Sequence, residues 1–343
     1  MRQARSAWAA AGFLVMAACG STDHGFTIGS PAAASSPAPA QAPASPTSSL
    51  HQPPFFVPPP DFASSARISS SPPAELGSCA VPYSNISEAD GGFIAYPGGQ
   101  RQSDPSSAVA LPGNTPGQVG VNIGLAFDRV VQRWVPVPLD WVAPRGLTYA
   151  YTDTSGRIRA VTVLTGSSGD VTVDGGWELI ATADDGVYAV KATTPGAWFV
   201  AFGGEPRQLV YSGTWERYSG GALWGVDSSR NLVQHDVVTG AETVWGPVSS
   251  YSDIVGFAAS GEPLVVTGGV LVMLHLTGTP TIVWPGNGDL GEGGRAYADA
   301  QGIWFEVDGS RVAEPGTGVY RWTPDKGAQL IAAEVVHVMG PCA

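Results

Sequence analysis

Hydrophobic and polar residues alternate along the chain from about residue 91 onward, in short runs separated by turn-forming residues. Alternation with a period of two is typical of strands that bury one face, and Gly-containing pairs between such runs are typical of tight turns. The pattern predicts a protein made mainly of short strands.

The turns fall into two interleaved series with nearly the same period. The first series, with steps of roughly 36 to 38 residues and a longer last step, is Val131-Gln132, Ser168-Gly169, Gly203-Gly204, Thr239-Gly240, Thr277-Gly278 and Asp325-Lys326-Gly327. The second, with steps of about 35 to 41 residues, is Arg145-Gly146, Asp185-Gly186, Gly220-Gly221, Ser260-Gly261 and Gln301-Gly302. Two series with one period indicate a repeated unit of two hairpins, which is the four-stranded blade of a β-propeller.

We therefore predict an all-β, six-bladed propeller. Blades 2 to 6 are expected at Trp141–Val173, Trp177–Tyr211, Trp215–Trp245, Asp253–Trp284 and Arg295–Ala332. Blade 1 is expected to be split, with outer strands at 93–96, 121–127 and 133–137 and an innermost strand, 335–338, supplied by the C-terminus. This overlap would close the ring and hide a strand edge. A pair of β-sandwich domains is the alternative, but it leaves the shared period unexplained.

The N-terminus predicts export and lipid attachment. Arg2 and Arg5 precede an apolar stretch, Ala7–Ala18, that is too short to span a bilayer. Val15-Met16-Ala17-Ala18-Cys19 resembles a bacterial lipobox, although Met16 stands where Leu is usual. The resemblance implies a signal peptide over residues 1–18 and a Cys19 that carries a diacylglycerol, with or without an added acyl chain such as palmitate. An uncleaved anchor or an ordinary signal peptide is the alternative.

Residues 19–75 are rich in Ala, Ser and Pro, which predicts a disordered, semi-extended tether before a folded domain at 76–343. If Cys19 carries lipid, Cys79 and Cys342 remain. A disulfide between them is the default outside the cytoplasm, and it would join the two ends of the folded domain. Two free thiols are the alternative.

Composition narrows the class of protein further. The 343 residues include 45 Gly and 11 Trp, and only 13% are charged, which disfavours a helical bundle. The net charge is −12, and residues 1–75 carry as many basic as acidic groups, so the whole net charge belongs to the folded domain. An acidic domain repels phosphate, so we expect no nucleic-acid partner.

Two segments carry a resemblance to a family. Ala143-Pro144-Arg145-Gly146 followed by Tyr149-Ala150-Tyr151 resembles the S-P-D-G and Tyr-Ala-Tyr signature of bacterial extracytoplasmic β-propellers. The ending Met339-Gly340-Pro341-Cys342 is similar to that of a group of bacterial propeller lipoproteins. Ala143 and Arg145 replace the Ser and Asp of the signature, so the turn-capping role of that Asp is absent. The resemblance, over roughly residues 79–343, implies a fold and no chemistry.

A candidate ligand site follows from the ring. Propellers gather the starts of their innermost strands at one mouth of the channel, together with the loops between second and third strands. The candidates at this mouth are Trp177, Glu178, Trp215, Glu216, Arg217, Asp253, Arg295 and His337. Aromatic rings, carboxylates and guanidinium groups suit a polar ligand such as a sugar, a peptide or a cation. Packing between blades is the competing explanation for the Trp residues.

Catalytic signatures are scarce. The sequence contains no HExxH, P-loop, GxSxG or CxxC motif, and we expect no cofactor and no metal. We therefore expect a membrane-anchored binding or interaction module in the bacterial envelope. Its expected partners are the lipid bilayer, through acylated Cys19, and an envelope protein or a glycan, and the domain is expected to be monomeric. The alternatives are an enzyme at the channel mouth (a lyase, glycosidase or sugar dehydrogenase) and a structural envelope protein without a small ligand.

Overall fold

The computed structural model describes residues 79–85, 90–110, 126–248, 253–267, 270–285, 290, 294–307, 317–333 and 337–342. The chain divides into two units, Met1–Ser49 and Leu50–Ala343, and all described residues belong to the second. The predicted signal peptide, Cys19 and the tether lie outside the described residues.

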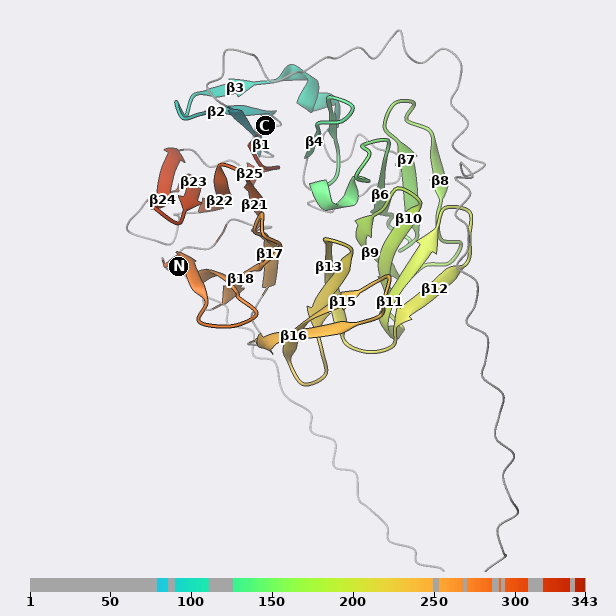
Figure 1. Cartoon of the computed structure of the whole chain (residues 1–343). Coiled ribbons are helices and arrows are strands. Elements are labelled where there is room, and N and C mark those ends of the chain that lie inside the picture. The colour runs from blue at the N-terminus through green and yellow to red at the C-terminus, as the bar shows by residue number, and fades with distance from the viewer. Residues whose placement is uncertain are drawn as a thin grey trace, which may run out of the picture. The chain divides into compact units, whose positions relative to one another are not determined.

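The described strands form a ring of six blades (Figure 1), which confirms the predicted β-propeller. Five blades are four-stranded antiparallel sheets and one has three strands in the described part of the chain. A two-stranded hairpin, β4 (Ala126–Asp128) with β5 (Arg133–Val135), stands between the first and second blades. β4 contacts β1 (Cys79–Asn85) of the first blade and the 3₁₀ helix η4 (Leu139–Trp141) that leads into the second.

Blades 3 to 6 follow the predicted boundaries closely, because each is a run of successive antiparallel hairpins. Blade 3 consists of β9 (Trp177–Thr182), β10 (Gly186–Lys191), β11 (Thr194–Ala201) and β12 (Pro206–Val210). Blade 4 consists of β13 (Thr214–Ser219), β14 (Ala222–Val226), β15 (Asn231–Asp236) and β16 (Glu242–Pro247). Blade 5 consists of β17 (Asp253–Phe257), β18 (Pro263–Thr267), β19 (Val270–Met273) and β20 (Thr281–Trp284). Blade 6 consists of β21 (Ala296–Asp299), β22 (Gly302–Val307), β23 (Gly318–Thr323) and β24 (Gly327–Ala332).

Blade 2 is irregular at its inner edge. Its strands are β6 (Thr148–Thr152), β7 (Ile158–Thr162) and β8 (Ser168–Asp170). Val142, directly after η4, forms an isolated bridge with Tyr149 on the free side of β6, so η4 and Val142 stand where another blade has its innermost strand. Ser168-Gly169, predicted as a turn, is instead part of β8, and the chain turns just before it, at Gly166, whose φ is +69°.

Blade 1 is split as predicted, but with different outer strands. Its order is β25 (His337–Val338), β1 (Cys79–Asn85), β2 (Asp90–Tyr96) and β3 (Arg101–Ser103). The C-terminal strand β25 pairs with β1, which confirms the predicted closure. The prediction was wrong for the second and third outer strands. Arg133–Val135 pairs with β4 in the separate hairpin, and the predicted 121–127 strand overlaps that hairpin at residues 126 and 127.

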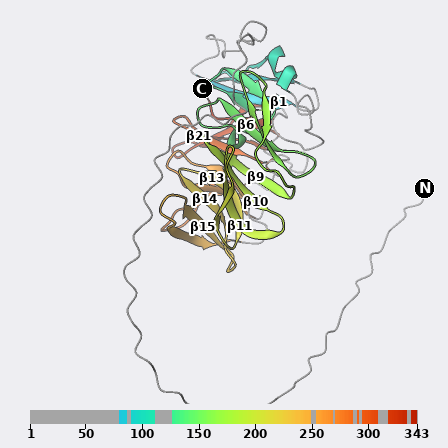
Figure 2. The same cartoon turned by 90° about the vertical axis from the view of Figure 1, so that its right-hand side faces the viewer.

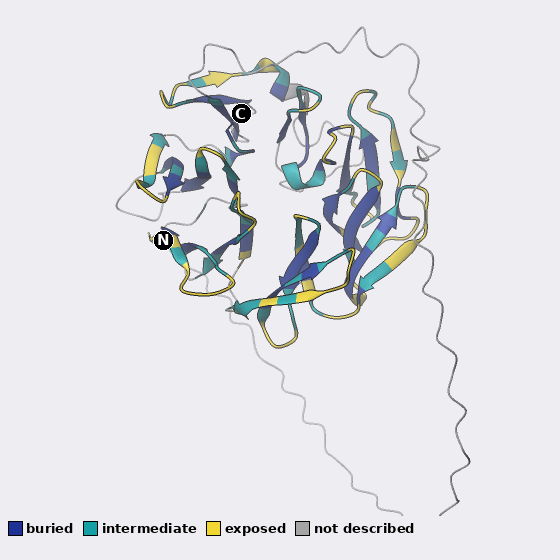
Figure 3. Ribbon diagram, viewed as in Figure 1, coloured by how far each residue is buried: buried dark blue, intermediate teal, exposed yellow. Residues whose placement is uncertain are grey.

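The core is distributed around the ring, with one apolar cluster at each junction. Trp177 packs with residues of blade 2, Trp215 joins blades 3 and 4, and Trp224 joins blades 4 and 5. Phe127 and Trp134 of the β4–β5 hairpin pack against Phe93 of blade 1, with ring centroids 5.1 and 5.4 Å from the Phe93 ring. Figure 3 shows buried residues on the inner strands and exposed ones on outer strands such as β24. The ring is therefore held together by apolar side chains between neighbouring blades.

Hairpin turns depend on glycine where the backbone must enter the left-handed region. Gly240 and Gly327 adopt φ values of +73° and +65° in the outer turns of blades 4 and 6, as the first turn series predicts.

Turned by 90°, the ring shows β9, β10 and β11 side by side in one blade (Figure 2).

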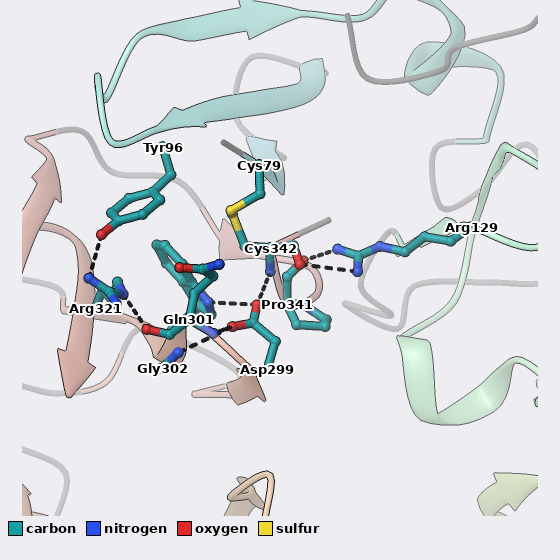
Figure 4. The surroundings of a disulfide bond; sticks show 10 residues. Cys79, Tyr96, Arg129, Asp299, Gln301, Gly302, Arg321, Pro341 and Cys342 are labelled. Carbon is teal, nitrogen blue, oxygen red and sulfur yellow. Dashed lines mark hydrogen bonds between the residues drawn. A yellow bond between two sulfur atoms is a disulfide. The ribbon is translucent and has the colours of Figure 1, made fainter. Parts of the chain in front are cut away.

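The two ends of the ring are joined covalently and by polar contacts (Figure 4). Cys79 and Cys342 form the predicted disulfide, with Cα atoms 5.6 Å apart. One carboxylate oxygen of Asp299 accepts hydrogen bonds from the backbone N–H of Cys342, at 2.6 Å, and from the indole of Trp304, at 2.9 Å. Arg129 donates to the carbonyls of Pro341 and Cys342. The C-terminus is thereby held to blade 6 and to the chain just after β4.

Candidate functional site

A cavity of about 1270 Å³ lies over the starts of the innermost strands of blades 3, 4 and 5. Its wall also includes the turn between β10 and β11, which lies on the same face as those strand starts. The stretch that leads into β21 supplies Leu290, Gly294 and Arg295. The sequence-predicted candidates that line it are Glu178, Trp215, Glu216, Arg217, Asp253 and Arg295.

A β-bulge in each of three innermost strands shapes the cavity wall. In β13, Trp215 pairs with Gly225 and Arg217 with Trp224, so Glu216 is an extra, unopposed residue. The same count makes Ile180 the extra residue of β9 and Val255 that of β17. All three bulged residues line the cavity. A bulge re-aims side chains and increases local twist, so Glu216 owes its position to this local irregularity.

Three carboxylates from three blades surround the outer part of the cavity. Glu178, Glu216 and Asp253 come from β9, β13 and β17, and all three residues are exposed. Glu216 faces the cavity, yet the walls partly bury it, and this burial raises the pKa of its carboxyl above the ordinary range. Repulsion from Asp253 adds to that rise in pKa, Arg217 opposes it, and Glu178 contributes a further rise.

Two guanidinium groups of the cavity wall, those of Arg217 and Arg295, form a cluster with the carboxylate of Asp140, which is not itself part of that wall. Asp140 forms an ion pair with Arg295 and a second one, at 3.6 Å, with Nη1 of Arg217. Burial would raise the pKa of Asp140, but the charges of Arg295 and Arg217 together hold it below its ordinary value. The Nε of Arg217 also donates to the carbonyl of Ile254 at 2.9 Å. Burial raises the pKa of the neighbouring Tyr297 to about 12, against the opposing charge of Arg295.

This cluster separates two spaces along the channel. Arg217, Val255 and Arg295 line the large cavity and also a smaller one of about 200 Å³. The smaller cavity has Asp140, Tyr297 and Pro341 in its wall, so it lies toward the Cys79–Cys342 disulfide. Arg217 and Arg295, which border both spaces, therefore form the floor of the large cavity.

The rings of Trp177 and Trp215 pack within the core. The indole N–H of Trp177 donates to Asp174 at 2.7 Å, its ring meets Trp198 edge-on, and Lys191 lies 4.7 Å from its centroid. The indole N–H of Trp215 donates to the carbonyl of Ser212 at 2.7 Å. Trp177 and Trp215 are each 4% exposed. Trp215 thus borders the cavity from within the core, and Trp177 is not part of its wall.

His337 lies apart from the other candidates. Its Nδ1 is 2.8 Å from a carboxylate oxygen of Glu306, whose second oxygen accepts the backbone N–H of Val338 at 3.0 Å. His337 is absent from the wall of the large cavity. The contact with Glu306 joins β25 to β22, which gives His337 a place in ring closure.

Sequence reasoning missed Asp140 and the β10–β11 turn. Asp140 directly precedes Trp141, the residue predicted to open blade 2, whereas Glu178 and Glu216 directly follow the corresponding Trp residues. Inspecting both neighbours of each blade-opening Trp would have found it. The turn from Ala192 to Gly196 carries no charged residue and therefore gave no signal.

The wall of the large cavity combines carboxylate and guanidinium side chains. Among the described residues, no group of three or more His, Cys, Asp or Glu side chains is arranged to hold a metal ion. In the same part of the chain, no helix has the length and apolarity needed to cross a membrane. Acceptors around the outer wall and donors at the floor are the chemistry that the cavity offers.

Comparison with protein-family models and with curated proteins gave no match. Solved structures with a similar course of the chain are those of β-propeller proteins. TolB from Acinetobacter baumannii is 12% identical, with a TM-score of 0.44 over 76% of this chain and 66% of that one, which is just under two thirds of its length. Virginiamycin B lyase from Staphylococcus aureus is 13% identical, with a TM-score of 0.41 over 74% of this chain and 85% of that one. A chain of a nidogen–laminin complex is 11% identical, with a TM-score of 0.38 over 74% and 89%. These similarities concern the fold alone.

Proposed function

We propose that the protein is a membrane-anchored, extracytoplasmic lipoprotein whose propeller binds a polar ligand or envelope partner at the charged cavity. The observation that carries the binding role is the cavity of about 1270 Å³ with charged side chains from four blades in its wall. Concave sites with a few convergent polar groups are the usual location of ligands on a rigid scaffold. The lipobox-like sequence before Cys19 supports the anchor, and the Cys79–Cys342 disulfide suits an oxidising compartment.

The anchor is tested by Cys19→Ala in the full-length chain. This variant lacks the cysteine that would carry the lipid, so the protein is expected in the soluble fraction and without incorporated palmitate. Ser21→Ala is the matched control and is expected to stay lipidated and membrane-bound. A Cys19→Ala protein that stays in the membrane fraction would show that the anchor assignment is wrong.

The binding role is tested by combining Glu178→Ala with Glu216→Ala. Native mass spectrometry of the intact protein against an envelope extract measures which small molecules bind. The wild type is expected to retain ligands that the double variant loses. Glu205→Ala, in the exposed turn between β11 and β12, is the matched control. Equal ligand retention by the wild type and the double variant would refute the site.

One observation favours an enzyme as the second candidate. Glu216, with its raised pKa, stands among Asp253 and Glu178, and pairs of carboxyl groups with different pKa values carry out acid–base catalysis in glycoside hydrolysis. Incubation with oligosaccharides tests this candidate. Product formation that Glu216→Gln abolishes would favour the enzyme, and an absence of product would exclude glycoside hydrolysis of those substrates.

A further inference from the structure

We infer that the ligand of the large cavity is a short peptide, bound with its C-terminal carboxylate at the Arg217–Arg295 floor and an ammonium group among Glu178, Glu216 and Asp253. This inference rests on the proposed function, because it names the ligand class of the same cavity. It is carried by the presence, in the wall of one cavity, of exposed carboxylates and of guanidinium groups that are mostly buried.

The floor carries an excess of positive charge. Two guanidinium groups, Arg217 and Arg295, share the single carboxylate of Asp140. Their side chains are only 22% and 18% exposed, so water screens them weakly, and an anion that replaces water there is attracted strongly. Burial lowers the pKa of Arg217 and the charge of Arg295 lowers it further, whereas at Arg295 the effect of burial is outweighed by the charges and hydrogen bonds of Asp140 and Tyr297, which raise its pKa. Arg217 is therefore the less compensated cation, with repulsion from Arg295 acting on it. A ligand carboxylate would relieve that repulsion.

The floor also has hydrogen-bond donors to offer. A guanidinium carries five N–H donors. The described contacts of Arg217 use its Nε, toward Ile254, and its Nη1, toward Asp140. Arg295 uses Nη1 toward Asp140 and also hydrogen-bonds with Tyr297. The remaining N–H groups suit the two oxygens of a carboxylate, which accept such donors with favourable geometry.

The outer wall has the opposite character. Glu178, Glu216 and Asp253 contribute three negative charges and are exposed, whereas the floor is mostly buried. Lys191 also lines the cavity, but its ammonium is held 2.6 Å from Asp174 and over the ring of Trp177, so it does not neutralise these carboxylates. A cationic group of the ligand would reduce the repulsion between Glu216 and Asp253.

The size of the cavity selects a peptide over a single amino acid. An amino acid carries its ammonium and carboxylate on one carbon, whereas the carboxylates of Glu178 and Asp253 belong to β9 and β17 and the guanidinium groups belong to β13 and to the stretch before β21. A volume of about 1270 Å³ exceeds the roughly 300–1000 Å³ of sites for drug-sized ligands, so several linked residues fit. Thr193 in the β10–β11 turn and Thr194 at the start of β11 add hydroxyl and backbone groups along the wall for a peptide backbone.

Isothermal titration calorimetry of the detergent-solubilised full chain tests the inference with three probes. Lysyl-alanyl-alanine carries one carboxylate and two ammonium groups, its C-terminal amide keeps both ammonium groups and lacks the carboxylate, and N-acetyl-trialanine keeps the carboxylate and lacks both ammonium groups. Lysyl-alanyl-alanine is expected to bind about tenfold or more tightly than either of the others, because the amide lacks the contact with the Arg residues and the acetylated peptide lacks the contact with the carboxylates. Glu216→Gln is expected to reduce the difference in affinity between lysyl-alanyl-alanine and N-acetyl-trialanine. Arg295→Gln is expected to reduce the difference in affinity between lysyl-alanyl-alanine and its C-terminal amide. The exposed variants Glu205→Gln and Arg207→Gln are the matched controls.

Each outcome is decisive. Equal affinity for lysyl-alanyl-alanine and its amide, or no binding of any probe, would overturn the inference. If the probes fail while another extract ligand still depends on Glu178 and Glu216, the inference falls and the proposed binding role stands. If no ligand depends on them, both fall. Should Arg295→Gln not fold, Glu216→Gln, a conservative change at an exposed position, still tests the ammonium contact.

Discussion

The disulfide allows the closure of the ring to be tested quantitatively. Cys79 and Cys342 are separated by 263 residues, so the bond ties together nearly the whole described part of the chain. On the chain-entropy model, a loop of this length destabilises the unfolded state by about 5–6 kcal/mol. Domains are typically stable by about 5–15 kcal/mol, so removal of the bond would cost a large share of the stability.

The variant to measure combines Cys79→Ser and Cys342→Ser in a Cys19→Ala background, which leaves no thiol to exchange. Urea unfolding, followed by the fluorescence of the 11 Trp residues, gives the free energy of unfolding. The double Ser variant is expected to lose several kcal/mol, and reduction of the parent protein should produce a similar loss. The Cys19→Ala parent under oxidising conditions is the control.

A loss below about 1 kcal/mol would refute the reasoning. It would mean that the contacts of Asp299 and Arg129 with the C-terminus close the ring without covalent help, or that the unfolded chain stays compact whether or not the bond is present. The denaturant slope distinguishes these cases, since a more compact unfolded state lowers it.

Three further predictions concern the cavity and the blade junctions. Asp140→Asn should lower the free energy of unfolding by about 1–3 kcal/mol at pH 7, because it leaves the two Arg residues unpaired at a site that is a third exposed. The pKa of Asp140 is lower in the folded state than in the unfolded state, so its contribution to stability is present above the ordinary Asp pKa and is lost as the pH falls below that value. The stabilities of the wild type and the variant should therefore converge in acid. A constant difference in unfolding free energy from pH 7 to pH 3 would contradict this. Glu216→Gln should stabilise the protein at pH 7 by less than about 1 kcal/mol, because burial and the charge of Asp253 raise the pKa of Glu216 and disfavour its ionised form in the folded state, while water screens the effect at this exposed position. The gain should vanish in acid, where Glu216 is protonated in both states, and destabilisation at pH 7 would argue against the repulsion. Trp215→Ala should cost about 3–5 kcal/mol, as expected for a 4% exposed ring at the junction of blades 3 and 4, and a smaller cost than for Trp215→Phe would be inconsistent with that packing.

The repeated part of the fold could be read from the sequence because its turns are local. A glycine that must adopt a positive φ, such as Gly240 or Gly327, marks a hairpin wherever it recurs at a fixed spacing. The ends of the ring could not be read in the same way. The closing strand at the C-terminus was predicted, but its partner β1 was not, because β1 contains Pro82, precedes the repeats and is identified only by tertiary packing. The predicted turn at Ser168-Gly169 was wrong because residues that usually form turns belong to the edge strand β8 there.

The site shows the same division. Glu178 and Glu216 follow the blade-opening Trp residues and could be grouped by the repeat. The ion pairs that Asp140 makes with Arg217 and Arg295 bring together residues from different blades, and no local pattern encodes them. The bulge at Glu216 depends on its pairing with β14 and is equally invisible in the sequence.

Amide hydrogen exchange of the full chain, with and without lysyl-alanyl-alanine, tests most directly whether the cavity over the innermost strand starts is the ligand site. Binding is expected to slow exchange in the β10–β11 turn, at the start of β13 and at the start of β17. Slower exchange confined to the face that carries Pro341, or no change at these three segments when the peptide is bound, would contradict it.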